Sequence, residues 1–196
     1  MGVHRRDVLK AAAASVVVGA ASALTGCVDG GAAEIRLPLA EREREDAMNS
    51  RPLMTVRIAA APPQQLGAVP HGIRTIVPVT GGDFEGPRLR GRILPGGGDW
   101  LLLRSDGVLE LDLRITLETD DRALIDMRFQ GLRHGPPDAI AALGRGEVVD
   151  PATYYFRTLP RFETSAERYA FLNRIISVGV GETRPDGAVH RIDEIL

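Results

Sequence analysis

The sequence predicts an all-β domain, an antiparallel barrel or sandwich of about nine strands with one or two short helices. From Leu53 onward, apolar and β-branched stretches alternate with short segments of Gly, Pro and Asp, which is typical of strands joined by turns. Only two short segments have the spacing of a helix. The expected strands are Met54–Ala60, Ile73–Val79, Pro87–Leu94, Trp100–Arg104, Val108–Thr119, Ala123–Gln130, Thr153–Thr158, Arg174–Gly181 and Ala188–Ile195.

The best-defined element is a hairpin over residues 108–130, with a turn at Asp120–Arg122. Apolar and polar residues alternate on both sides of the turn, and a register shifted by one residue would mix the two faces. We therefore expect Arg114 to lie opposite or diagonal to Asp126. The residues expected in the core are Leu113, Ile115, Leu117, Ile125, Met127 and Phe129. Because buried charges are costly unless paired, the charged face is interpreted as solvated: Glu110, Asp112, Arg114, Asp126 and Arg128.

Two segments are predicted to be helical. Asp138–Leu143 follows a pair of prolines, which favour the first turn of a helix. Ser165–Asn173 begins with a residue suited to the N-cap and places Tyr169 and Leu172 on one face.

Four motifs point to a known family: Gly81–Trp100 (GGDFEGPRLRGRILPGGGDW), Leu111–Arg114 (LDLR), Tyr154–Arg157 (YYFR) and Pro160–Thr164 (PRFET). Together they resemble the domain-of-unknown-function family 3237, also called uncharacterised protein family 0311, over about residues 53–196. The resemblance implies a single closed antiparallel β-barrel. It also implies a small-molecule activity, since one relative is associated with a lyase acting on 4-hydroxylaminobenzoate. A family turn that usually carries Asp-Gly reads Asp121-Arg122 here.

The N-terminus resembles an export signal. Arg5-Arg6 precede the uncharged run Ala11–Leu24, whose 14 residues are fewer than a transmembrane helix needs. The pair resembles the twin-arginine signal, and Leu24–Cys27 resembles a lipoprotein box. We expect a signal peptide over residues 1–26, a lipidated Cys27 with a flexible tether to residue 52, and a barrel over residues 53–196. The protein would then be held on the periplasmic side of a membrane. The alternative is an ordinary signal with an unmodified cysteine.

Composition excludes several classes of protein. Lys10 is the sole lysine, so after loss of the leader no lysine remains for a Schiff base, pyridoxal phosphate or a phosphate loop. The remaining chain has a net charge of −4, against −2 for the whole chain, which does not favour nucleic-acid binding. No two histidines have metal-ligand spacing, and Cys27 is the single cysteine. We therefore expect no cofactor and no metal.

The strongest candidate site is the glycine-rich stretch that ends in Asp99-Trp100. Glycines would let a ligand approach the backbone, Trp100 would stack on it, and Asp99 would act as acid or base. We expect this stretch to meet His71, a second candidate acid or base, and Tyr155 at one barrel end. The candidate cations for a substrate carboxylate are Arg90 and Arg157. In the structural alternative, Asp99 caps a turn and Trp100 closes the barrel.

Two functions are compatible with these patterns. The first is an exported, membrane-tethered barrel that binds a small aromatic or carboxylated molecule and acts on it as a lyase or isomerase. The second is a non-catalytic envelope protein whose barrel is a protein-interaction module. A concave cavity holding Asp99 and a titratable partner would favour the first, and a barrel filled with aliphatic side chains would favour the second.

Overall fold

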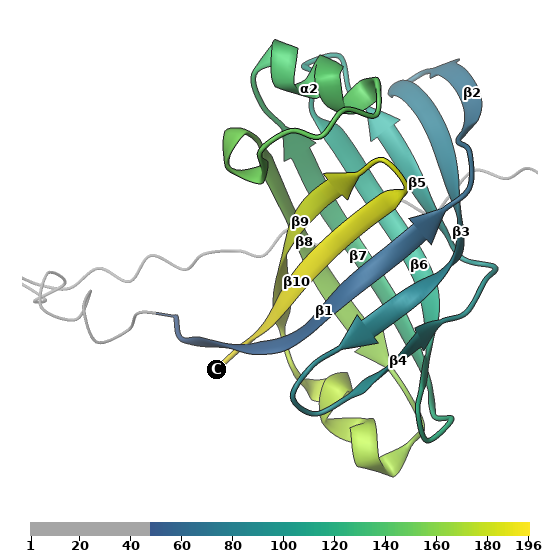
Figure 1. Cartoon of the computed structure of the whole chain (residues 1–196), viewed down its shortest axis with the longest axis vertical. Coiled ribbons are helices and arrows are strands. Elements are labelled where there is room, and N and C mark those ends of the chain that lie inside the picture. Colours follow the sequence, from purple (N-terminus) through teal and green to yellow (C-terminus); the bar gives the residue numbers. More distant parts are fainter. Residues whose placement is uncertain (1–47) are drawn as a thin grey trace, which may run out of the picture. The chain divides into compact units, whose positions relative to one another are not determined.

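The computed structural model describes residues 48–196, which form ten strands and three short helices (Figure 1). The strands are β1 (Ser50–Ala60), β2 (Gln64–Val69), β3 (Gly72–Glu85), β4 (Arg90–Ile93), β5 (Gly98–Leu103), β6 (Leu109–Thr119), β7 (Leu124–His134), β8 (Tyr155–Glu163), β9 (Ser177–Arg184) and β10 (Gly187–Ile195). The helices are α2 (Pro137–Gly144) and the 3-10 helices η1 (Pro151–Thr153) and η2 (Glu167–Arg174). The predicted signal peptide and Cys27 lie outside the described residues. Within residues 48–196, no helix is long and apolar enough to cross a bilayer.

The sheet closes on itself as an antiparallel barrel. β1 pairs with β10 on one side and with β3 on the other, which joins the two ends of the strand order. β4 and β5 share the position between β3 and β6, so eight strand positions surround the interior. β2 lies outside this ring and pairs with the first half of β3. The predicted closed barrel is confirmed.

Closure depends on a close approach of β1 to β3. Gly82, in β3, has a φ of +134°, and a Cβ added there would lie 2.0 Å from the carbonyl oxygen of Arg57 in β1. Any larger residue would force the two strands apart, so glycine is needed at this position.

The predicted hairpin is confirmed as β6 and β7. Leu113 pairs with Phe129 and Ile115 with Met127, and all six predicted core residues are buried. Arg114 pairs with Arg128 and so lies diagonal to Asp126, which pairs with Thr116. The five charged residues predicted to be solvated, Glu110, Asp112, Arg114, Asp126 and Arg128, lie on the outer face of the two strands.

The turn between these strands contains an unusual backbone conformation. Arg122 has a φ of 67°, and it is the one non-glycine residue with a positive φ among residues 48–196. Glycine adopts this conformation without strain, which explains physically why an Asp-Gly pair suits the turn.

Several sequence predictions need correction. β2 was not predicted, and β1 begins at Ser50, before the expected tether boundary at residue 52. The second helix is a 3-10 helix whose N-cap is Ala166, so Ser165 does not cap it. The strand predicted from Arg174 begins at Ser177. Apart from the missed strand β2 and the 3-10 geometry of the second helix, these errors lie at the boundaries of elements.

The core fills one half of the barrel. Its most buried side chains include Leu53, Phe84, Leu117 and Met127 of the strands and Leu172 of η2. Tyr169 of η2 donates a hydrogen bond to Asp121 Oδ1 at 2.9 Å, which fixes this helix on the barrel. Packing at the η2 end leaves the other half of the interior for a cavity.

Gly181→Ala should destabilise the protein by about 1–3 kcal/mol, because overpacking forces side chains off their rotamers. An added Cβ would lie 2.6 Å from ring atoms of Phe156 inside the barrel. Gly144→Ala is the matched control, since nothing lies within 4 Å of its added Cβ. Urea unfolding of both variants measures the difference. Equal stabilities would show that Phe156 has room to move.

Candidate functional site

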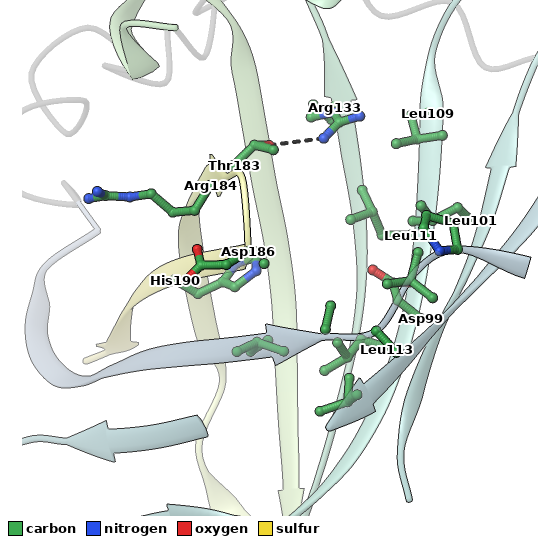
Figure 2. A pocket seen from close by; sticks show the side chains of 18 of the residues that line it. Asp99, Leu101, Leu109, Leu111, Leu113, Arg133, Thr183, Arg184, Asp186 and His190 are labelled. Carbon is green, nitrogen blue, oxygen red and sulfur yellow. Dashed lines mark hydrogen bonds between the residues drawn. The ribbon is translucent and has the colours of Figure 1, made fainter. Parts of the chain in front are cut away.

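A cavity of about 430 Å³ occupies the free half of the barrel (Figure 2). Its walls are mainly aliphatic side chains, together with Phe156: Ile58, Val77, Val79, Leu101, Leu109, Leu111 and Leu113. Residues 60–63, which follow β1, and the β9–β10 turn around Asp186 also line it. A volume of this size suits a small organic molecule.

Asp99 is buried in the cavity wall. It lies on β5 between Val77 of β3 and Leu113 of β6 and is 9% exposed. Its Oδ1 accepts a hydrogen bond from the backbone N–H of Asp112 at 3.0 Å. Burial raises the pKa of its carboxyl to about 7 and outweighs both this hydrogen bond and the attraction of Arg133, which lower the pKa. Asp99 therefore changes protonation near neutral pH.

Arg133, on β7, supplies a cation to the same cavity. Its Nη1 donates a hydrogen bond to Thr183 Oγ1 at 2.9 Å, while its Nε is buried without a partner. Burial lowers the pKa of the guanidinium from its usual value, against the raising effect of Tyr154 and Asp99. Among residues 48–196, no carboxylate oxygen lies within 4.0 Å of Arg133, so its charge has no direct ion-pair partner in the described structure.

His190 is a third ionisable side chain that is largely buried in the cavity wall, where Thr183, Arg184 and Asp186 also lie. It lies on β10, is 1% exposed, and contacts Phe129 and Phe156 at ring-centroid distances of 4.7 and 5.1 Å. Burial lowers its pKa to about 4, so the imidazole is neutral near pH 7. Its Nδ1 is buried and has no hydrogen-bond partner.

These three groups reach the cavity from separate parts of the ring, on β5, β7 and β10 (Figure 2). A carboxyl that ionises near pH 7 in an apolar cavity can accept or donate a proton. A buried guanidinium without an ion pair can hold an anionic group by charge-assisted hydrogen bonds. The arrangement can therefore bind a small anion and move a proton on it.

The predicted association of Asp99 with Trp100 in one site is corrected by the structure. The two residues are neighbours on β5, so their side chains point to opposite faces of the barrel wall. Trp100, 39% exposed, lies on the outside with Tyr155 and Arg157. We call this region, with a volume of about 820 Å³, the outer groove: Arg74, Trp100, Leu132, Tyr155, Arg157 and Leu159.

The remaining predicted residues lie away from the cavity. His71 is exposed in the turn between β2 and β3. Arg90 is exposed and its Nε donates a hydrogen bond to Asp120 Oδ2 at 2.8 Å. Among residues 48–196, no three His, Cys, Asp or Glu side chains are grouped so that they could hold a metal ion.

Arg133 and His190 were missed as site residues, although the sequence contains a signal for each. Arg133 continues the period-two series of inward residues from Ile125 to Phe129. His190 is in the same phase as buried Ile192. The predicted strand ended at Gln130, which removed Arg133 from the series.

Similarity to known proteins extends over the whole barrel. A family model described as a protein of unknown function (DUF3237) matches residues 48–195. A UPF0311 protein of Rhodopseudomonas palustris is 37% identical over 130 residues, which are 66% of this chain and 85% of the relative. A β-barrel-like protein from Acinetobacter baumannii is 38% identical with a TM-score of 0.67, covering 76% of this chain and 96% of that structure. An enzyme from Penicillium herquei has a TM-score of 0.58 at 19% identity, and the match covers 76% of this chain and 95% of that structure. At this identity the likeness shows the fold alone.

Proposed function

The chain belongs to the DUF3237 family, and we propose that its barrel binds a small aromatic or carboxylated molecule and acts on it as a lyase or isomerase. The observation that carries the proposal is the placement of Asp99 and Arg133 in one apolar cavity without an ion pair between them. Two buried charges are costly when unpaired. A ligand anion bound to Arg133 would reduce the free-energy cost of keeping this guanidinium unpaired in the cavity.

Asp99 is the proposed proton carrier. Its carboxylate takes a proton from the bound ligand, and Arg133 stabilises the negative charge that develops. The carboxylic acid then returns the proton to another atom of the ligand, which is an isomerisation, or to a leaving group, which is an elimination. Both outcomes conserve atoms and electrons and need no further reactant.

Binding of carboxylate probes to the full-length protein tests the proposal. The probes are benzoate, 2-naphthoate and octanoate, each compared with its neutral amide in thermal-shift and calorimetric titrations. A bound ligand stabilises the native state, so we expect the carboxylates to raise Tm more than the amides do. Equal effects of carboxylates and amides, or no effect of either, would contradict the proposal.

A second candidate function, a protein-interaction module, is favoured by the outer groove, which exposes Leu132, Tyr155 and Leu159 beside Trp100. Trp100 is the chain's single tryptophan, so its fluorescence reports on this groove. Occupation of the outer groove would shift its emission. A probe bound inside the barrel should leave the emission nearly unchanged.

We also propose that the protein is exported by the twin-arginine route and anchored through a lipid on Cys27. The support is the Leu-Thr-Gly-Cys sequence that closes the uncharged run of the leader. Mass spectrometry of membrane-extracted protein should find an acylated Cys27 as the first residue. Cys27→Ala should release the protein from the membrane fraction. A soluble mature chain that begins at another residue would refute the lipid anchor.

A further inference from the structure

We infer that His190 is a ligand-contacting residue whose imidazole hydrogen-bonds an uncharged polar group, such as a hydroxyl or carbonyl, of the molecule in the cavity. This inference rests on the proposed function. It adds a second contact to the site, at a distance from the anion held by Arg133.

The first support is a group of unsatisfied polar atoms. Within residues 48–196, three buried side-chain polar atoms have no hydrogen-bond partner: Arg133 Nε, Thr158 Oγ1 and His190 Nδ1. Arg133 and His190 line the cavity, and Thr158 follows Phe156 on the inner face of β8. Buried polar atoms in folded proteins are nearly always paired. Two of the three, Arg133 Nε and His190 Nδ1, belong to residues that line the same cavity, which indicates that a bound molecule supplies the missing partners.

The second support is the position of His190 relative to Arg133. Phe156 is close to both residues, with its ring centroid 5.9 Å from the Arg133 guanidinium carbon and 5.1 Å from the His190 ring centroid. Arg133 pairs with Phe156 across β7 and β8, and His190 pairs with Gly181 across β10 and β9. A ligand whose anion is held by Arg133 can extend over Phe156 and reach His190.

The surroundings of His190 determine the kind of group it can hold. Its contacts with Phe129 and Phe156 are apolar, and no carboxylate forms an ion pair with it within the described part of the chain. An imidazolium would be costly in this position, whereas a neutral imidazole offers one donor and one acceptor nitrogen. The matching ligand group is therefore an uncharged donor or acceptor.

Pairs of probes that differ by one hydroxyl group test this contact in the full-length protein. The pairs are benzoate with 4-hydroxybenzoate and 2-naphthoate with 6-hydroxy-2-naphthoate. Because one hydrogen bond is added, the wild type should bind at least one hydroxylated probe about two- to tenfold more tightly than its parent. His190→Phe keeps a planar ring and should abolish this preference, so that the variant binds the parent and the hydroxylated probe with equal affinity. His134→Phe, on the outside of β7, is the matched control and should retain the preference.

Nitrogen NMR of the wild type gives a second measurement that does not depend on a variant. Addition of the preferred hydroxylated probe should shift the imidazole nitrogens of His190, and the parent should not. The inference is overturned if a parent carboxylate binds through Arg133 and neither added hydroxyl group raises the affinity, or if His190→Phe keeps the preference for a hydroxylated probe. If no carboxylate binds at all, the proposed function itself fails, and the inference fails with it.

Discussion

At pH 8, the Asp99→Asn variant should be more stable than the wild type by an amount on the order of 4 kcal/mol. The carboxyl of Asp99 ionises near its ordinary pKa of 3.8 in the unfolded chain and at about 7 in the folded protein. As pH rises through this interval, the unfolded state releases its proton first, so the wild type loses stability. Asparagine has no proton to lose and keeps the oxygen that accepts the hydrogen bond of Asp112.

His190 contributes to the pH dependence of folding stability with the opposite sign to Asp99. Its pKa falls from 6.5 to about 4 on folding, so its stabilising contribution is present above pH 6.5 and is lost as pH falls to 4. In the wild type the two groups should nearly offset each other between pH 4 and 6.5. In Asp99→Asn the offset is absent, and stability should therefore rise with pH over that interval.

Urea unfolding of the wild type and the Asp99→Asn variant at several values between pH 4 and 8 measures both effects. Asp126→Asn, on the exposed face of β7, is the matched control and should show no such trend. A variant that is less stable than the wild type at pH 8 would show that Asp99 is chiefly a structural residue. Gain of stability with loss of function is common where a site keeps a group that the fold alone does not favour.

Arg133→Met should weaken the binding of carboxylate probes by roughly 10- to 100-fold, because it removes a charge-assisted hydrogen-bond donor from an apolar cavity. The affinity for the neutral amides should fall much less. The Tm of the ligand-free variant should equal or exceed that of the wild type, since a buried guanidinium without an ion pair is replaced by an apolar side chain.

Arg128→Met on the same strand is the control for this prediction. Arg128 is exposed on the outer face of β7, so its replacement should leave the affinity for every probe unchanged. Calorimetric titration of both variants with 2-naphthoate gives the comparison. If Arg133→Met binds carboxylates as tightly as the wild type does, Arg133 is not the anion-binding group.

Period-two alternation predicted the parts of the fold where it is uninterrupted. Residues 109–117 and 123–129 alternate without a break, and the two strands pair there with apolar residues opposite apolar residues, as predicted. The second strand, β7, continues to His134, past its predicted end at Gln130. β2 was missed because its sequence, QQLGAV, contains neither a long apolar series nor β-branched residues before its last position. Its strand conformation depends on pairing with β3, which local sequence does not encode.

The sequence predicted one residue of the cavity site, Asp99, but not the geometry of the site. Asp99 was selected because it follows three glycines, and the structure places it in the cavity. Trp100 was assigned to the same site because the predicted strand began at Trp100 and left Asp99 before it, whereas β5 already begins at Gly98. Arg133 and His190 are distant in sequence and meet Asp99 through barrel closure, a long-range property that no local pattern shows.

A crystal structure of the full-length protein with 2-naphthoate tests the central claim most directly. We expect the naphthoate inside the barrel, with its carboxylate on Arg133 and its rings over Phe156, within reach of the Asp99 carboxyl. A naphthoate bound instead in the outer groove, against Trp100 and Arg157, would contradict the claim.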